Sequence, residues 1–193
     1  MSMEPQVNKI CKSGYFHIRN IWSIRKNLNM KDTKTLIHAF VTSVLDNGNS
    51  LLYRISKKLL NKLQVLQNSA ARVVVQKRKF DHITETRKEL HWLPIEARIK
   101  YKLLTFVWKS LNNISPSHIS NMLIWKEISR NLRRLDTNTL VIPRTNLITF
   151  GDRAFEKAAP VLWNRLPIEI RNAETLAIFQ SRLKTSLFIQ YYE

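Results

Sequence analysis

Apolar residues along this chain recur mainly at steps of three and four, the spacing that places side chains on one face of an α-helix. The clearest stripe lies within residues 56–76 and consists of Leu59, Leu63, Leu66, Ala70 and Val73. Small residues at 69–71 would allow a second helix to approach closely. We predict an amphipathic helix whose stripe faces the core of a bundle, with a dimer seam as the alternative.

Stripes of the same period predict helices over residues 7–26, 33–45, 84–93, 94–109, 120–123, 151–165 and 175–188. Asp32 or Thr33 is the expected N-cap of the second of these, and Thr84 is the expected N-cap of the third. Pro94 suits the first turn of a helix, whereas Pro160 is expected to kink or restart one. Residues 46–49, Asp-Asn-Gly-Asn, are typical of a turn that stops a helix.

Two segments depart from the helical pattern. Residues 140–150 place β-branched runs on either side of a Pro-Arg-Thr-Asn turn, which favours a small hairpin. Residues 125–138 are polar and lack a period, which is typical of a surface loop or linker. The sequence therefore predicts an all-α multi-helix bundle with one possible short β-hairpin near 140–150. Its parts are a basic helical region over 1–124, the linker 125–138, and a region 139–193 that packs on the same core.

The strongly positive charge of the chain is the main indication of its binding partner. The 193 residues include 32 Lys and Arg but only 14 Asp and Glu, a formal net charge of +18. Such a charge makes a compact chain repel itself unless a polyanion shares its surface, so RNA or DNA is the leading partner. A membrane surface is the rival partner. No membrane-spanning segment is expected, because no apolar run approaches the roughly 20 residues that a spanning helix needs.

Cysteine and glycine usage excludes several classes of protein. Cys11 is the only cysteine, which rules out an internal disulfide and a multi-cysteine zinc site. With three glycines, the chain cannot build the usual glycine-rich nucleotide-binding loop. The first residues have no apolar signal-peptide core. We expect an intracellular location, nuclear or cytoplasmic, and no cofactor; the oligomeric state stays open.

No catalytic constellation is predicted. The five aspartates are scattered, whereas two-metal chemistry needs clustered carboxylates. Asp81, His82 and His91 could form an acid–base pair or a metal site, but helix capping and buried hydrogen bonding are the favoured interpretation. We therefore predict no catalytic residue and no metal ligand.

The basic residues gather in one stretch. Residues 54–109 hold fourteen Lys and Arg against four Asp and Glu. Projected on a helix, Arg98, Lys102, Thr105 and Lys109 form a polar strip on an otherwise apolar surface. The predicted phosphate contacts are Lys77, Arg78, Lys79, Arg98, Lys102 and Lys109, with Phe80 and Trp92 as possible base-stacking partners. The alternatives are a plain solvated face for the cations and core packing for the aromatics.

Several short segments of the sequence resemble those of a known family. They are Lys79–Thr84 (KFDHIT), Glu89–Pro94 (ELHWLP), Gly151–Phe155 (GDRAF) and Ala158–Pro167 (AAPVLWNRLP), with further matches at 36–43, 49–53 and 66–72. From about Asn8 to Phe188, the chain resembles the C-terminal portion of reverse transcriptases from non-LTR retrotransposons, or LINEs, of the jockey and chicken-repeat type. The motif residues singled out as structural are Asp81, His82, Thr84, His91, Trp92, Pro94, Gly151, Asp152, Trp163 and Pro167.

The resemblance implies a helical region downstream of the polymerase palm, similar to a thumb and the segment after it. The family's complete protein is an RNA-directed DNA polymerase, but its palm signature of paired aspartates is absent here. The implied function is a truncated fragment that binds RNA or template-primer through a basic surface without polymerising. Two alternatives remain: a helical protein–protein interaction module derived from a mobile element, and a thumb for a palm encoded upstream. Residues 46–49 and Arg54 depart from the family pattern, as expected of a decayed copy.

Overall fold

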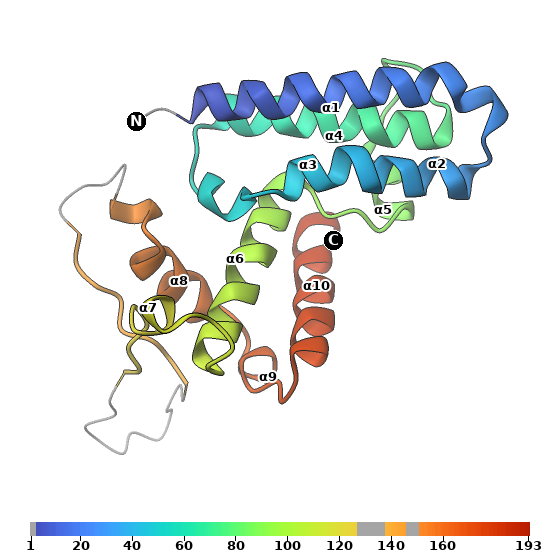
Figure 1. Ribbon diagram of the computed structural model, residues 1–193. Coiled ribbons are helices and arrows are strands. Elements are labelled where there is room, and N and C mark those ends of the chain that lie inside the picture. The colour runs from blue at the N-terminus through green and yellow to red at the C-terminus, as the bar shows by residue number, and fades with distance from the viewer. Residues whose placement is uncertain (1–2, 127–137, 146–150) are drawn as a thin grey trace. The chain divides into compact units, whose positions relative to one another are not determined.

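The computed structural model describes residues 3–126, 138–145 and 151–193, and these are mainly helical (Figure 1). The α-helices are α1 (Glu4–Ile24), α2 (Met30–Ile37), α3 (Ser43–Asp46), α4 (Lys57–Val75), α5 (Thr84–Glu89), α6 (Ile95–Leu111), α7 (Ser117–Ser120), α8 (Phe155–Trp163), α9 (Ile168–Arg171) and α10 (Leu176–Tyr192). Turns of 3-10 helix are η1 (Arg25–Asn27), η3 (Asn49–Leu52) and η4 (Gly151–Arg153), and η2 (His38–Thr42) is π-helical. The predicted all-α multi-helix class is confirmed.

The chain divides into two compact units. Unit 1 comprises Met1–Ile99 with Tyr191–Glu193, and unit 2 comprises Lys100–Gln190. Helices α6 and α10 contribute residues to both units. The linker predicted over 125–138 lies almost entirely outside the described residues, and so do its three arginines, Arg130, Arg133 and Arg134.

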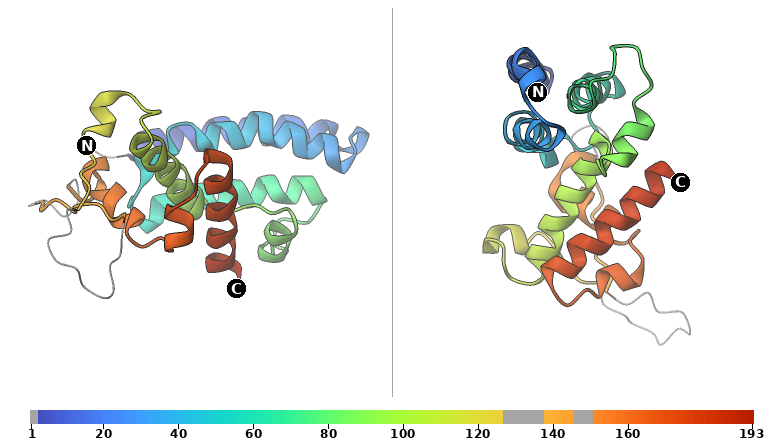
Figure 2. Two further views of the ribbon diagram at one scale, coloured as in Figure 1. Left: turned by 90° about the horizontal axis from the view of Figure 1, so that it is seen from below. Right: turned by 90° about the vertical axis from the view of Figure 1, so that its right-hand side faces the viewer.

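Unit 1 is built around three helical rods: α1, the continuous run α2–η2–α3, and α4. The right-hand view of Figure 2 shows α1, α2 and α4 nearly end-on, at the corners of a triangle. The predicted stripe of α4 faces inward, since Leu63, Leu66, Ala70 and Val73 are buried and Leu59 is half-buried. Gly14 of α1 lies against Leu66, where an added Cβ would come within 2.6 Å of a Leu66 methyl carbon. The stripe is therefore a core face and not a dimer seam.

Two predicted N-caps are wrong. Asn29 caps α2, because its side chain accepts a hydrogen bond from the Asp32 amide at 2.8 Å. Thr84 is the first residue of α5 and not its cap; Ile83 holds that position without a side-chain hydrogen bond. Ile83 is buried. We infer that core packing at Ile83 fixes the start of α5, which outweighs the preference for a hydroxyl cap.

The turn at residues 46–49 is confirmed. Helix α3 ends at Asp46, and Gly48 follows in the left-handed region with φ of 65°. This backbone conformation is easily reached only by glycine and a few polar residues.

Helix starts in unit 2 also differ from expectation. Pro116 directly precedes α7, so the short helix predicted over 120–123 forms earlier, at Ser117–Ser120. Residues 151–153 form the 3-10 turn η4, and α8 begins only at Phe155. It then continues through Pro160 to Trp163 without restarting. Pro167 precedes α9, a helix that the apolar pattern did not predict.

Unit 2 has an aromatic centre. The Phe179 ring stacks against both Trp108 and Trp163, and the centroid of each tryptophan ring lies 5.9 Å from that of Phe179. Trp108 Nε1 donates to the Ala173 carbonyl at 3.3 Å, and Trp163 Nε1 donates to the Asn138 carbonyl at 3.0 Å. These bonds satisfy the indole donors that burial would otherwise leave unpaired.

The hairpin predicted near 140–150 falls partly on residues 146–150, which lie outside the described part of the chain. Among described residues no β-strand forms, and Leu140 makes an isolated antiparallel bridge with Trp125. Two backbone hydrogen bonds flank this bridge, from Val141 to Ile124 and from Lys126 to Thr139. The described partner of this segment is therefore residues 124–126, at the start of the predicted linker.

Candidate functional site

The predicted phosphate contacts fall on both units. Lys77, Arg78, Lys79 and Arg98 belong to unit 1, whereas Lys102 and Lys109 belong to unit 2. The polar strip expected along α6 is interrupted, because Thr105 is buried and donates to the Tyr101 carbonyl at 2.8 Å. Lys102 is exposed, with its ammonium 5.6 Å from the centre of the Phe106 ring.

Arg98 is already paired with an acid. Its Nε donates to Asp46 Oδ1 at 2.9 Å, and its Nη2 donates to Asp46 Oδ2. Asn49 adds a donor to the same carboxylate at 3.1 Å. A bidentate arginine–carboxylate pair of this kind has little capacity left for phosphate. Arg98 therefore ties the first turns of α6 to the turn at 46–49.

Residues 77–81, which we name the basic loop, form a tight turn between α4 and α5. The Arg78 amide donates to Asp81 Oδ2 at 2.8 Å, and Arg72 Nη2 donates to the Asp81 carbonyl at 3.1 Å. The turn leaves the Phe80 side chain 90% exposed, with Lys79 Nζ 5.6 Å from its ring centroid. Lys77 donates to Thr86 Oγ1 at 2.7 Å. The loop thus holds an aromatic ring and two exposed cations, Arg78 and Lys79, in solvent.

A hollow of about 400 Å³ opens beside this loop. Its walls come from α1, α4 and the basic loop: Tyr15, Ile18, Arg19, Trp22, Ser69, Arg72, Val73, Lys77 and Lys79. Four of these nine residues are cationic and two are exposed aromatics, Tyr15 and Trp22. No acidic residue is among the described side chains that line it.

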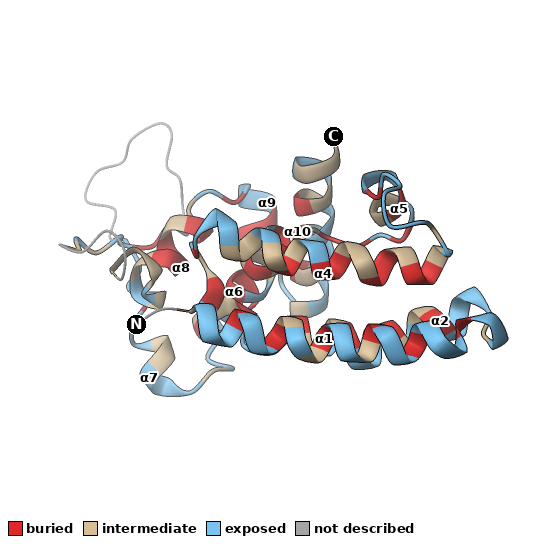
Figure 3. Ribbon diagram, turned by 90° about the horizontal axis from the view of Figure 1, so that it is seen from above, coloured by how far each residue is buried: buried red, intermediate tan, exposed pale blue. Residues whose placement is uncertain are grey.

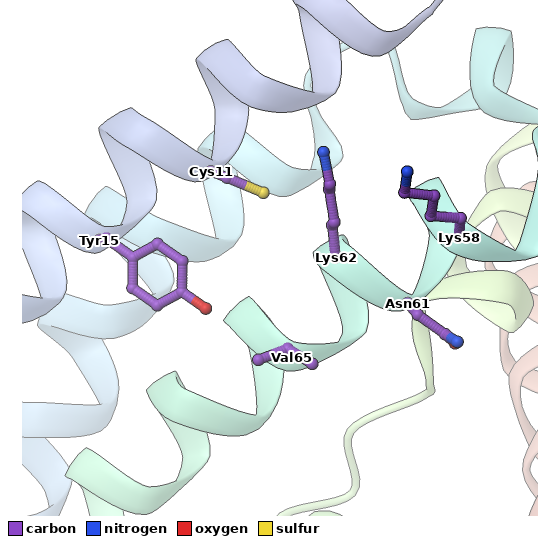
Figure 4. A pocket seen from close by; sticks show the side chains of 6 residues that line it. All are labelled: Cys11, Tyr15, Lys58, Asn61, Lys62 and Val65. Carbon is purple, nitrogen blue, oxygen red and sulfur yellow. The ribbon is translucent and has the colours of Figure 1, made fainter.

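A second hollow of about 410 Å³ lies further along the same two helices and shares Tyr15 with the first. It is lined by Cys11, Tyr15, Lys58, Asn61, Lys62 and Val65. Figure 4 shows Cys11 and Tyr15 extending from α1 and the two lysines rising from α4. Lys62 Nζ lies 3.1 Å from Asn8 Oδ1 and 3.4 Å from Glu4 Oε1. Partial burial raises the pKa of the Cys11 thiol, while the nearby Lys62 charge lowers it.

Together the two hollows form what we call the α1–α4 groove. The contributing positions follow helical spacing on α1, at residues 11, 15, 18, 19 and 22, and on α4, at residues 58, 61, 62, 65, 69, 72 and 73. Figure 3 shows α1 and α4 side by side with their outer faces exposed and their inner faces buried. The groove is thus the outer seam of the three-rod bundle.

The predicted motif residues near α5 serve the fold. Trp92 is buried, and its carbonyl accepts from the Tyr192 hydroxyl at 2.6 Å. The Leu93 carbonyl accepts from Gln67 Nε2 at 2.8 Å. Trp92 therefore has no face free for a base, and core packing is the correct interpretation for it. Pro94 immediately precedes α6, whose Arg98 amide donates to the Pro94 carbonyl at 3.0 Å.

His82 and His91 are exposed, so the predicted burial of these two side chains is wrong. The backbone of His91 follows the end of α5 with φ of 54°, in the left-handed region. Its amide donates to the Lys88 carbonyl at 3.0 Å, and the Trp92 amide donates to the Arg87 carbonyl at 2.9 Å. This is the pattern of a left-handed helix stop.

In unit 2 the motif residues Gly151 and Asp152 also contact neighbouring parts of the fold. Asp152 Oδ1 forms an ion pair with Lys157 Nζ at 2.8 Å, and Lys157 also donates a hydrogen bond to Thr145 Oγ1 at 2.6 Å. Gly151 lies so close to Thr145 that a Cβ would come within 2.8 Å of it. Across the described residues, no group of three or more His, Cys, Asp and Glu side chains is placed to hold a metal ion.

Sequence reasoning missed the cations and aromatics contributed by α1. Arg19, Tyr15 and Trp22 lie at steps of four and three, so the spacing could have revealed a shared face. That this face borders Arg72 of α4 depends on helix packing and could not be read from the sequence.

Among the described helices, none is long and apolar enough to cross a membrane. Comparison with protein-family models, curated proteins and solved structures found no match to the chain.

Proposed function

We propose that the chain binds nucleic acid through the α1–α4 groove and the basic loop, as the post-palm portion of a non-LTR retrotransposon reverse transcriptase. One observation carries the proposal: a hollow lined by Arg19, Arg72, Lys77 and Lys79 also presents the exposed rings of Tyr15 and Trp22. Cations alone are common on a solvated surface. Cations set around exposed aromatic rings are typical of surfaces that bind nucleotides.

Charge supports the same partner. The net charge of +18 favours a polyanion, and the described groove lining concentrates six cations: Arg19, Lys58, Lys62, Arg72, Lys77 and Lys79. Phosphate contacts supply most of the sequence-independent affinity for nucleic acid, since each releases condensed counterions. The resemblance in sequence implies element RNA or template-primer as the natural polyanion.

Of the residues predicted from sequence, Lys77, Arg78 and Lys79 remain in the proposed interface. Arg98 is omitted from it because Asp46 already holds its guanidinium. A protein–protein interaction module would have to present the apolar stripes of residues 56–76 and 175–188 to its partner. The central residues of both stripes are buried: Leu63, Leu66 and Ala70 in α4, and Phe179, Leu183 and Leu187 in α10. Their burial favours nucleic-acid binding over the interaction module.

A titration tests the proposal. The full chain is mixed with a labelled ten-nucleotide RNA at salt concentrations from 50 to 200 mM. If about five phosphates are contacted, a slope of roughly −0.7 per phosphate predicts about hundredfold weaker binding over that range. Binding that does not respond to salt would falsify the proposal. Primer extension above background by the same preparation would instead support the thumb alternative.

A pair of charge reversals controls for net charge. Arg19→Glu removes a groove cation, whereas Lys31→Glu makes the same change on the exposed start of α2. We expect Arg19→Glu to weaken binding and to reduce the salt slope by about 0.7. Lys31→Glu should change both far less. Equal effects would mean that net charge alone, and not the groove, attracts the RNA.

A further inference from the structure

We propose that the α1–α4 groove accepts a single strand of nucleic acid whose bases stack on Trp22 and Tyr15, and that it discriminates against duplexes. This inference rests on the proposed function and names the substrate class of the same site. It assigns to α1 a base-stacking role.

Trp22 is far more exposed to solvent than the tryptophans of the core. Among the described residues, Trp92, Trp108 and Trp163 are at most 4% exposed, whereas Trp22 is 54% exposed and Tyr15 is 39% exposed. Trp22 and Tyr15 line the same hollow, one α-helical turn to either side of Ile18. Large rings left in water beside cations offer flat apolar surfaces on which any base can stack.

The state of the bases decides between single strand and duplex. In a duplex the base faces are already stacked on each other, so Trp22 and Tyr15 would gain no partner. A single strand can splay its bases onto aromatic side chains while its phosphates reach nearby cations. Arg19, Arg72 and Lys79 line the Trp22 end of the groove, and Lys58 and Lys62 line the other end. Cations thus lie at both ends of the aromatic pair.

Helix geometry gives the length of the strand. At about 1.5 Å per residue, the part of α1 from Cys11 to Trp22 spans about 16 Å. A stacked strand has one phosphate about every 3.4 Å, so about five phosphates fit along the groove.

Fluorescence quenching tests the stacking. Trp125, the other exposed tryptophan among the described residues, is first replaced by Phe. Ten-nucleotide oligouridylate and oligothymidylate are then titrated into the full Trp125→Phe chain, beside a ten-base-pair DNA duplex and phosphatidylserine vesicles. Both single strands should quench the emission at the concentration where they bind. The duplex should bind at least tenfold more weakly and leave the emission unchanged.

Substitutions at Trp22 then show whether the quenched emission comes from this residue. In the Trp125→Phe background, Trp22→Phe should abolish the quenching yet keep most of the affinity, because a ring remains. Trp22→Ala should weaken single-strand binding at least fivefold. Both positions are exposed, and a thermal melt of each variant checks the fold. Oligouridylates of increasing length should gain affinity up to about five nucleotides and then level off.

The outcomes separate this inference from the proposed function. If no nucleic acid binds at 50 mM salt, both fail. If strand and duplex bind equally, or bound strand leaves Trp22 emission unchanged, the stacking inference is overturned while nucleic-acid binding stands. If vesicles alter Trp22 emission and no strand binds, the groove binds lipid surface and both are overturned.

Discussion

The guanidinium of Arg25 donates from Nε to the carbonyl oxygen of Val73 at 2.9 Å, across a sequence separation of 48 residues. Its Nη2 donates to the Val74 carbonyl at 2.9 Å, and its Nη1 donates to the Leu28 carbonyl at 2.6 Å. Helix α4 ends at Val75, so Arg25 satisfies carbonyls that the helix itself cannot pair. The same side chain fixes the end of α1 against the end of α4, where the groove meets the basic loop.

Replacing Arg25 should destabilise unit 1 strongly. Arg25→Met leaves the Val73 and Val74 carbonyls without this donor in a buried position, so we expect a loss of about 3 kcal/mol. Arg25→Lys should retain only part of this stability, because an ammonium group cannot reproduce the planar arrangement of donors of the guanidinium. Urea unfolding followed by circular dichroism measures the loss. Lys26→Met, at the exposed neighbouring position, is the matched control and should change stability by less than about 0.5 kcal/mol.

Asn164 should be equally sensitive in unit 2. Its Oδ1 accepts from the Leu140 amide and its Nδ2 donates to the Leu140 carbonyl, both at 2.8 Å. Asn164→Ala should cost about 2–3 kcal/mol because both backbone groups lose their side-chain partner. Asn164→Asp keeps the acceptor and loses the donor, so it should also destabilise. Asn121→Ala, at an exposed position, serves as the control; a similar loss there would contradict the proposed role of Asn164.

Replacing Gln76 should stabilise unit 1, in contrast to the two changes above. This exposed residue ends α4 with φ of 55°, a conformation that costs a side-chain-bearing residue free energy and that glycine adopts easily. We expect Gln76→Gly to raise the free energy of unfolding by about 0.5–1 kcal/mol. Gln76→Ala retains a Cβ and should bring no such gain. A thermal melt of both variants measures the difference, and a gain shared by alanine would rule out the backbone explanation.

These residues show where sequence reasoning succeeds and where it stops. The inward stripe through Leu63 and Leu66 could be predicted because apolar periodicity is a local property that packing preserves. The pairing of Arg98 with Asp46 could not, because 52 residues separate them and a charged residue on a helix looks the same whether it meets acid or water. The α1–α4 groove could not be predicted from sequence for the same reason, because its lining comes from two helices that are brought together only by packing.

Tyr192 should make unit 1 sensitive to alkaline pH. Burial raises the pKa of its phenol, while Arg87 lowers it in part. A folded-state pKa above the unfolded value of about 10 means that folding favours the protonated phenol. Its contribution is therefore complete below pH ~10 and is lost as pH rises through the folded pKa. Tyr192→Phe should cost about 1 kcal/mol at neutral pH by removing the bond to the Trp92 carbonyl.

The pH profile of the two proteins checks this assignment. Tyr192→Phe should flatten part of the decline in stability above pH 10. Burial also raises the pKa of Tyr101, in unit 2, so some decline of the same sign should remain in the variant. An identical alkaline decline in both proteins would mean that Tyr192 does not contribute to it.

Glu4 should restrain nucleic-acid binding at the far end of the groove. Its carboxylate lies 3.4 Å from Lys62 Nζ and so competes with phosphate for that cation. Glu4→Gln removes the competing charge, and we expect severalfold tighter binding of a ten-nucleotide strand with a salt slope steeper by about 0.7. The effect requires Lys62, so Glu4→Gln should give no such gain when combined with Lys62→Gln. Because Glu4 also lies in the first turn of α1, where negative charge is favourable, the variant should lose up to about 1 kcal/mol of stability. Tighter binding by a less stable variant would show that Glu4 acts on the groove through charge and not through the fold. An equal gain in the double variant would place the effect of Glu4 elsewhere than at Lys62.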